Sequence, residues 1–234
     1  MTSIDETLGP LTALVGHLRW RAQAPAADDL LAVDLAADAD RFAQVVATSA
    51  EGRGSDDPQV LGSLWWQAYS YRVAGMALAA WALTGGAPDP AAPGAGVGLA
   101  RSRPSALVVD PSATVISDLD TLVGRLFADH LDPVADALRA RHALGAQLVW
   151  GDTAAGIASV LGAVATAEGA PPLRDRVDQV VAALPHRIGE LGAWAPGGWA
   201  FRRRTCCLWW KTSAANGALC EDCSLRPEPQ GAAR

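Results

Sequence analysis

The four cysteines of the chain lie in two pairs close to its C-terminus. Cys206 and Cys207 are adjacent, and after twelve intervening residues Cys220 and Cys223 form a Cys-x-x-Cys pair. Thiols grouped in this way have three common uses: disulfide bonds, a structural zinc site, or an iron–sulfur cluster. The chemistry predicted for the chain therefore depends on which use the spacing favours.

The spacing fits an iron–sulfur cluster better than the other two uses. A disulfide between adjacent cysteines strains the backbone, and nothing else in the sequence indicates an oxidising compartment. Structural zinc favours two Cys-x(2–4)-Cys knuckles, and only Cys220/Cys223 forms one. A [2Fe–2S] cluster needs two thiolates per iron and accepts ligands spread over a wider object. Zinc remains the alternative, and the spacing does not tell which cysteines share an iron.

Cations and tryptophans flank the cysteines in a chain whose formal net charge is −6. A cluster held by four thiolates is negative and becomes more so on reduction, so nearby cations raise its potential. The same cations could dock an acidic electron donor or an anionic ferric chelate, or simply form a solvated basic segment. Aromatic rings here either face the cluster and substrate or pack a small subdomain. The candidate residues are Arg202, Arg203, Arg204, Trp209, Trp210 and Lys211, with Trp199 upstream.

Other residue types predict no second reactive centre. The four histidines have no metal-site spacing among themselves; they are His17, His130, His142 and His186. No phosphate loop or dinucleotide fingerprint is present, so we expect electrons to arrive from another protein. The pI of about 5.1 and the lack of a basic stripe argue against nucleic-acid binding.

The cysteine pattern resembles that of the FhuF-like ferric-siderophore reductase family. The segments "RRRTCCLWW" and "GALCEDC" match in kind and order, and "LVWGDTAAGIASVLGA" (148–163) is similar to the family's Trp-Gly-Asn/Asp helix start. The resemblance implies a [2Fe–2S] cluster on Cys206, Cys207, Cys220 and Cys223 that passes one electron to Fe³⁺ in a siderophore and releases Fe²⁺. Twelve residues separate the pairs instead of the family's ten, a difference that a surface loop tolerates at small cost.

Three further expectations concern partners and alternatives. The implied partners are a ferric siderophore and a protein electron donor, such as a ferredoxin or its reductase. One alternative is a [2Fe–2S] electron carrier or a redox or iron sensor, although a sensor is expected to carry a basic recognition helix that the sequence lacks. The other alternative is a zinc-stapled binding protein in which the metal only folds the C-terminus.

Periodicity predicts the elements that position the cysteines: an α+β fold, mostly helical, with a small antiparallel sheet. We expect a body over residues 1–200, a cluster-binding segment over 201–225 and a flexible tail over 226–234. A strand is expected to lead into the cysteines, and the sheet is expected within 96–118. Asp152 is expected to cap a helix start. Helices are predicted over 4–22 with an interruption near Pro10, and over 34–50, 58–83, 119–130, 132–143, 146–167 and 172–184.

No stretch of the sequence is expected to span a membrane. The most membrane-like segment, "VAGMALAAWAL" over 73–83, has eleven apolar residues, whereas a span needs about 20. Asp5 and Glu6 stand where a secretion signal requires positive charge. We therefore expect a buried helix at 73–83 and a cytoplasmic protein, in which clustered thiols stay reduced.

Overall fold

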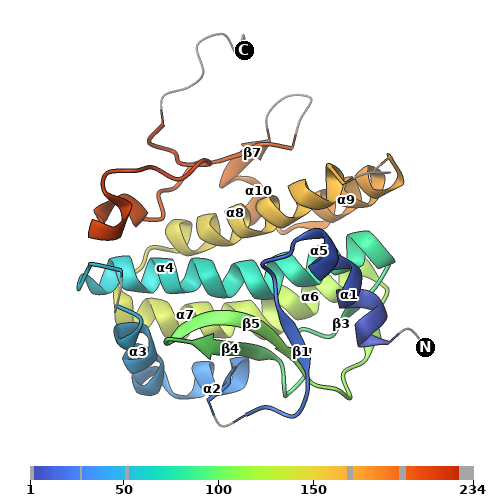
Figure 1. Cartoon of the computed structure of the whole chain (residues 1–234), viewed down its shortest axis with the longest axis horizontal. Helices are drawn as coiled ribbons and strands as arrows, with labels where there is room; N and C mark the ends of the chain where they lie inside the picture. The colour runs from blue at the N-terminus through green and yellow to red at the C-terminus, as the bar shows by residue number, and fades with distance from the viewer. Residues whose placement is uncertain (1–2, 27, 51–52, 168–170, 195–198, 227–234) are drawn as a thin grey trace.

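The computed structural model describes residues 3–26, 28–50, 53–167, 171–194 and 199–226, and it confirms the α+β class with helices predominant (Figure 1). The last part of the described chain lies over α4 and α8, on the side of α4 that faces away from the sheet. The helices are α1 (Ile4–Leu14), α2 (Ala32–Ala37), α3 (Ala39–Thr48), α4 (Pro58–Ser70), α5 (Met76–Thr84), α6 (Leu119–Gly124), α7 (Asp132–His142), α8 (Ala146–Ala165), α9 (Pro171–Ala183) and α10 (His186–Gly189).

The helix predicted over 58–83 is confirmed as one continuous rod at the centre of the molecule. The Asp57 side chain caps its start by accepting hydrogen bonds from the backbone N–H groups of Gln59 and Val60. A π-helical turn, η1 (Tyr71–Gly75), joins α4 to α5 without a break. The rod ends at Gly85, whose φ of 81° is left-handed and therefore suits glycine. A second π-turn, η2 (Arg125–Leu131), joins α6 to α7 in the same way.

The predicted hairpin forms the middle of a larger sheet. Strands β4 (Gly96–Ala100) and β5 (Arg103–Val109) pair antiparallel, and the sheet order is β1-β5-β4-β2. Strand β1 (Trp20–Ala22) lies parallel to β5, and β2 (Leu30–Leu31) lies antiparallel to β4. The sheet is therefore mixed, because a distant N-terminal strand pairs with the local hairpin.

Two predictions for the N-terminal and sheet regions are wrong in detail. The helix predicted over 4–22 ends at Leu14, because the chain beyond it turns to supply β1, and Pro10 lies inside α1 without interrupting it. The last part of the 96–118 region, in which the sheet was expected, does not join the main sheet. It supplies β6 (Val115–Ile116), which pairs with β3 (Ala87–Pro88) in a separate two-stranded sheet.

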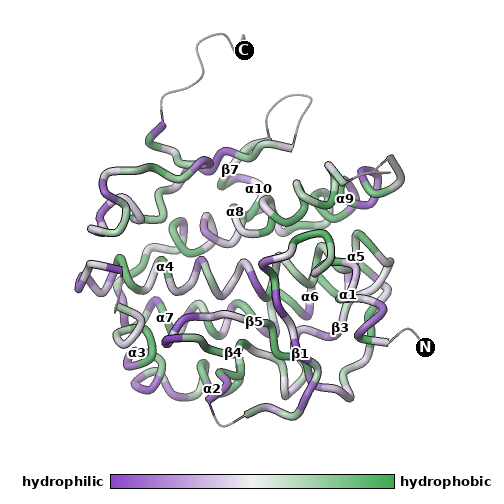
Figure 2. Tube along the Cα trace, in the orientation of Figure 1, coloured by the Kyte–Doolittle hydropathy of each residue, from purple (hydrophilic) through white to green (hydrophobic). Residues whose placement is uncertain are grey.

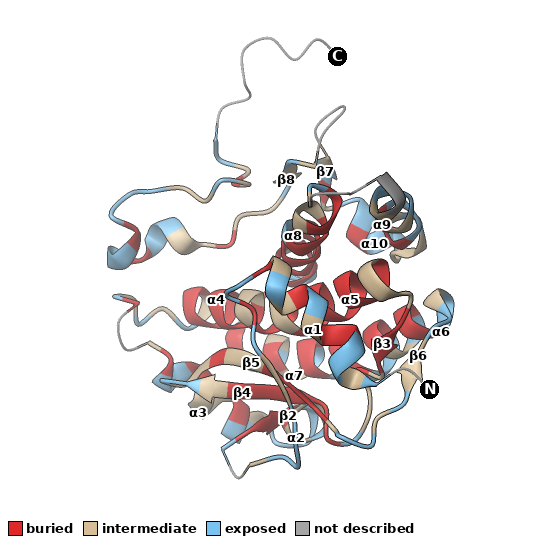
Figure 3. Cartoon of the chain, turned by 45° about the vertical axis from the view of Figure 1, so that its right-hand side comes forward, coloured by how far each residue is buried: buried red, intermediate tan, exposed pale blue. Residues whose placement is uncertain are grey.

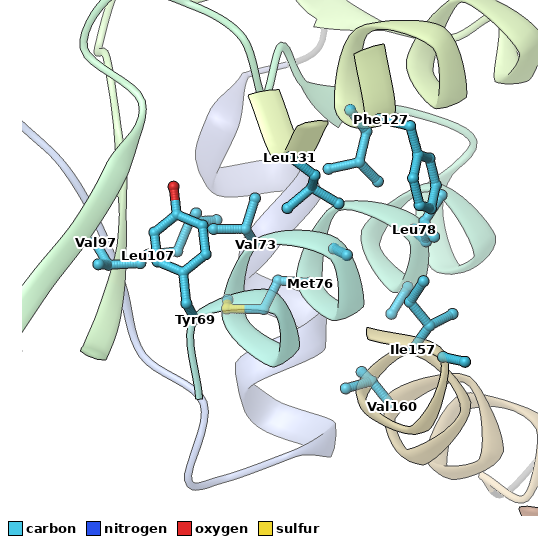
Figure 4. Close-up of a cluster of buried hydrophobic side chains, with 14 of the residues drawn as sticks. Tyr69, Val73, Met76, Leu78, Val97, Leu107, Phe127, Leu131, Ile157 and Val160 are labelled. Carbon is cyan, nitrogen blue, oxygen red and sulfur yellow. The ribbon is translucent and has the colours of Figure 1, made fainter. Parts of the chain in front are cut away.

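The hydrophobic core fills the space between the sheet, the central rod, η2 and α8. Figure 4 shows Tyr69, Val73 and Met76 on the rod between sheet residue Leu107 on one side and Val160 of α8 on the other. Buried residues are concentrated in α4, α5 and α8 (Figure 3), and hydrophobic residues predominate in α5 and α8 (Figure 2). The core thus packs α8 against α4, and the segment that carries the cysteines packs on these two helices.

Helix α8, rather than the 73–83 stretch, is the one described helix long and apolar enough to cross a membrane by length and composition. In the structure 83% of its most apolar window is buried inside the protein. Burial of this extent is that of a core helix, because a membrane span exposes its apolar surface to lipid. The expected burial of 73–83 is confirmed, since nearly all of α5 is inaccessible to solvent.

The predicted strand before the cysteines is β8 (Phe201–Arg203), which pairs antiparallel with β7 (Gly192–Trp194). The Phe201 ring lies close against Gly192, where a Cβ would come within 1.9 Å of the ring. Two short 3₁₀ turns, η3 (Trp209–Lys211) and η4 (Ser213–Ala215), follow the first cysteine pair. We call residues 201–225 the cysteine segment. The division into body, segment and tail stays a prediction, and of the tail only Arg226 is among the described residues.

Candidate metal centre

The two cysteine pairs, thirteen or more residues apart in sequence, meet in the cysteine segment. The Sγ atoms of Cys207 and Cys220 are 3.3 Å apart, close to the roughly 3.7 Å between two thiolates that share a tetrahedral metal. Cys206 is within electrostatic range of both Cys207 and Cys223. Cys207 and Cys223 are buried, Cys206 and Cys220 are partly exposed, and all four are free thiols. The segment therefore brings four sulfur atoms together without a disulfide.

Backbone N–H groups point at the sulfur atoms. The N–H of Leu208 donates to Cys206 Sγ at 3.4 Å, and the N–H of Leu225 donates to Cys223 Sγ at 3.4 Å. To make the first turn, Leu208 adopts a left-handed φ of 64°, a conformation that costs a non-glycine residue free energy. Such N–H groups stabilise negative charge on sulfur, as they do around iron–sulfur clusters. The donor set, four thiols with backbone N–H donors, suits a thiolate-bound metal group.

The contact between Cys207 and Cys220 shifts the pKa values of these two thiols in opposite directions. The Cys220 thiol, together with burial, raises the pKa of Cys207, and the same hydrogen bond lowers the pKa of Cys220. Metal binding requires deprotonated thiols, so Cys220 is the member of this pair that ionises first. Across the described residues, no group of three or more His, Cys, Asp or Glu side chains is arranged to surround a single ion.

A buried ion-pair network fastens the cysteine segment to α8. The Arg203 side chain is 2% exposed, and its Nη1 donates to Asp152 Oδ1 at 2.8 Å. Its Nε and Nη2 donate to the two carboxylate oxygens of Asp222, at 2.7 and 3.0 Å. Arg203 therefore joins three parts of the structure: strand β8, the Cys220–Cys223 turn and the second turn of α8. Because one guanidinium donates to two carboxylates, the three hydrogen bonds fix the orientation of the Arg203 side chain.

The role expected for Asp152 as a helix cap is wrong. Helix α8 begins at Ala146 with Gly145 at its N-cap position, so Asp152 lies within the second turn. Its carboxylate is fully buried, where an unpaired charge is very costly. Burial raises the pKa of Asp152, and the Arg203 guanidinium and the Ser63 hydroxyl oppose that rise. The residue is therefore the acidic partner of Arg203 rather than a donor to the helix end.

Ser63 extends this network to α4 and to the cysteine backbone. Its buried hydroxyl lies 2.9 Å from Asp152 Oδ2 and 2.9 Å from the carbonyl oxygen of Cys207, so both acceptors lie within reach of its single hydrogen. Burial acts to lower the pKa of Arg203, but its hydrogen bonds to Asp222 and the charge of Asp152 outweigh this and raise it. Arg203 is therefore charged, and its charge opposes the rise in the pKa of Cys207 and adds to the effect of the Cys207 hydrogen bond that lowers the pKa of Cys220.

Close backbone contacts bring the segment directly onto the body. A Cβ at Gly151 would come within 1.8 Å of Thr205 Oγ1, and a Cβ at Gly54 would come within 1.7 Å of Ser213 Oγ. The backbone N–H of Ser213 also donates to the Gly54 carbonyl at 3.0 Å. Gly54 has a φ of +64°, so glycine is required there both for conformation and for space.

The structure separates the predicted basic residues into two groups. Arg203 is buried and paired with Asp152 and Asp222, and it lies within electrostatic range of Cys207 and Cys220, so it does not contribute to an exposed basic surface. Arg204 and Lys211 are exposed, and Arg202 donates to the carbonyl of Arg226. These three remain candidates for tuning the charge around the cysteines, because their side chains do not enter the body.

The two predicted tryptophans also lie differently. Trp210 is 44% exposed, the most exposed aromatic side chain among the described residues, whereas Trp209 is partly buried and lines a cavity. Of the histidines, His130 is buried and hydrogen-bonded to the Tyr69 hydroxyl and the Pro90 carbonyl. Its contacts are those of a core histidine, as the sequence predicted.

The cavity beside Trp209 is the largest feature of the site that the sequence does not reveal. It has a volume of about 820 Å³ and lies between α4, η1, α8 and the cysteine segment. Its wall includes Arg53 and Tyr71 from the body and Trp199, Trp209 and Glu221 from the C-terminal part. None of these body residues belongs to a motif, so no sequence signal points to them. The same holds for Ser63.

Comparisons with known proteins leave the family open: no protein-family model matches the chain, and no curated protein sequence is significantly similar to it. The candidate site therefore depends on its own residues. These are the four cysteines, the anchoring network of Arg203, Asp152 and Ser63, and the adjoining cavity.

Proposed function

We propose that this protein is a [2Fe–2S] ferric-siderophore reductase. The observation that carries the proposal is the meeting of the two cysteine pairs, with the Sγ atoms of Cys207 and Cys220 at 3.3 Å, beside a cavity of about 820 Å³. This volume lies within the usual range of about 300–1,000 Å³ for small-molecule sites. The resemblance of the cysteine pattern to the FhuF-like family supports the same reading.

The reaction is the transfer of one electron. A [2Fe–2S] cluster on Cys206, Cys207, Cys220 and Cys223 supplies a one-electron carrier close to the cavity. The electron reduces Fe³⁺ of the substrate chelate to Fe²⁺, and a donor protein restores the electron. Siderophores hold Fe³⁺ through hard oxygen donors, and the lower charge of Fe²⁺ weakens that hold and releases the ion.

The residues of the chain contribute position and charge. Arg203, Asp152 and Ser63 fix the first cysteine pair against α8 and α4, close in the chain to Arg203 and Trp209, which line the cavity. The charge of Arg203 is offset by Asp152 and Asp222, whereas positive charge from Arg202, Arg204 and Lys211 nearby favours the more negative reduced state. The backbone N–H groups that point at Cys206 and Cys223 act in the same direction.

The proposed electron donor is an acidic redox protein, such as a ferredoxin or its reductase, in the cytoplasm. Around the cysteines the surface offers exposed Arg204, Lys211 and Trp210. Basic residues steer an acidic partner toward the site, and an exposed tryptophan supplies apolar contact at the centre of such an interface.

The first experiment asks which metal the cysteines hold. Protein purified without oxygen should be brown-red and contain iron and acid-labile sulfide in equal amounts. Replacement of Cys207 or Cys220 by serine should remove the cluster and leave most of the helical circular dichroism, because the core lies elsewhere. Zinc without sulfide would instead establish the zinc-stapled alternative.

The second experiment separates a reductase from an electron carrier. Reduced protein is mixed with ferric hydroxamates in a stopped-flow cell, and reoxidation of the cluster is followed by its visible absorption. A reductase is reoxidised at a rate that saturates with chelate concentration, while the Fe²⁺ product is trapped by a ferrous chelator. A cluster that no ferric chelate reoxidises would belong to a carrier or sensor.

A further inference from the structure

The cavity next to the cysteines contains an arginine that forms no ion pair with the acidic side chains of the described residues. Arg53 lines the cavity and is 8% exposed. Its Nε is buried and finds no hydrogen-bond acceptor, and no acidic side chain in the described part of the chain forms an ion pair with it. A buried guanidinium normally has a carboxylate or several carbonyl groups around it, so the Nε of Arg53 is open to an acceptor that a ligand supplies.

The surroundings of Arg53 add positive charge rather than remove it. Burial, followed by repulsion from Arg103, lowers the pKa of Arg53 to about 10, so the side chain is still charged at neutral pH. Of the two acidic residues that line the cavity, Asp222 is occupied by Arg203. The other, Glu221, is exposed. The buried side of the cavity therefore favours an anionic oxygen, which binds an arginine fork well.

The other residues that line the cavity indicate which further groups a ligand should carry. Trp199, Phe201 and Trp209 supply aromatic surface, while Gln67 and Ser159 supply hydrogen-bonding groups. Trp209 is two residues from Cys207, and Glu221 lies between Cys220 and Cys223. A molecule in the cavity is thus a neighbour of both cysteine pairs.

From these observations we propose that the cavity binds the ferric chelate and that Arg53 pairs with a carboxylate on it, so the favoured substrates are chelates that carry a free carboxylate. This inference rests on the proposed function, since it names the substrate class for the same site. The carboxylate enters the buried side of the cavity, and the iron-bearing part lies toward Trp209 and the cysteines.

The test is a binding measurement that needs no electron transfer. Gallium replaces iron because Ga³⁺ is not reduced, and two complexes are compared: those of N-succinyl- and N-acetyl-desferrioxamine B, which differ in a pendant carboxylate. Calorimetric titration of the wild-type protein should show tighter binding of the succinyl complex. Because a hydrogen-bonded ion pair contributes about 1.5–3 kcal/mol, Arg53→Gln should weaken binding of the succinyl complex at least tenfold and leave the acetyl complex nearly unchanged.

Two further variants make the result specific. Arg41→Gln removes the same charge from an exposed position on α3 and should retain the wild-type preference. Ser159→Trp places a large ring on an exposed lining position and should weaken binding of both complexes. The inference is overturned if the wild-type protein binds the two complexes equally, if Arg53→Gln keeps the preference, or if Ser159→Trp binds both as the wild type does.

Failure of this inference is distinct from failure of the proposed function. Reoxidation of the reduced cluster by ferric chelates, together with unchanged gallium binding in Arg53→Gln, would keep the reductase and reject the cavity assignment. Absence of the cluster, or of any reoxidation, would reject the reductase whatever the gallium titrations show.

Discussion

Replacement of Asp152 by alanine tests whether the buried network holds the cysteine segment on the body. The change removes a carboxylate that is 0% exposed and leaves Arg203, 2% exposed, with Asp222 as its only acidic partner among the described residues. It also takes away one acceptor of the Ser63 hydroxyl. Loss of one partner of a buried ion pair costs about 3–5 kcal/mol, because the other charge is left uncompensated.

This cost should appear locally. The network joins β8 and the two cysteine turns to α8 and α4, while the core around α5 has no part in it. The free energy for opening the cysteine segment should fall by about 3–5 kcal/mol, which raises the open population at least about a hundredfold. Backbone amides between 201 and 212 should then exchange hydrogen faster by a similar factor, and amides of α5 should keep their protection.

The measurement is hydrogen exchange followed by mass spectrometry, with trypsin cleavage within the segment as a second readout. Asp132→Ala is the matched control, because Asp132 pairs with Arg187 on the surface, where both side chains are at least 33% exposed. Its loss should cost no more than about 1 kcal/mol. Unchanged exchange in the segment of Asp152→Ala, or equal acceleration throughout the chain, would refute the anchoring role.

Three other changes give separate expectations. Gly151→Ala should displace the cysteine segment and destabilise it by about 1–3 kcal/mol, since the added Cβ would lie 1.8 Å from a threonine hydroxyl. Gly124→Ala is the control and should have no such effect, because a Cβ there meets nothing within 4 Å. The metal content of the two purified variants checks this expectation. Replacement of Arg202 and Arg204 together by glutamine should lower the midpoint potential of the bound cluster, and the effect should be smaller at high salt. An unchanged potential in potentiometry would mean that these charges are too far from the cluster to influence it. Burial lowers the pKa of His130 from 6.5 to about 4, so the histidine of the unfolded chain takes up a proton at higher pH than that of the folded protein. The free energy of unfolding should therefore fall by about 2 kcal/mol from pH 7 to pH 5. Urea unfolding of His130→Gln should lack this loss, and an equal loss in the variant would assign it to other groups.

Local signals in the sequence predicted most of the helices. Asp57 followed by Pro58 marks a helix start because both residues act within the first turn, and the apolar run that follows fits only a buried helix. The hairpin of β4 and β5 was also predicted, because its strands are close in sequence. The parallel pairing of β1 with β5 was not, since it joins Trp20 to Leu107 and no local pattern specifies a partner so distant.

The features of the candidate site can also be separated into those that the sequence determined and those that the tertiary structure decided. By itself, the sequence determined where the thiols are and which chemistry their spacing favours, because ligand types and spacings are properties of a short segment. Only the tertiary structure decided that Arg203 faces inward to Asp152, that Ser63 reaches the Cys207 carbonyl, and that the buried Nε of Arg53 finds no acceptor among the described residues around the adjoining cavity. Each of these depends on burial, which is set by the packing of distant elements and determines whether a charge is solvated, paired or open to a ligand.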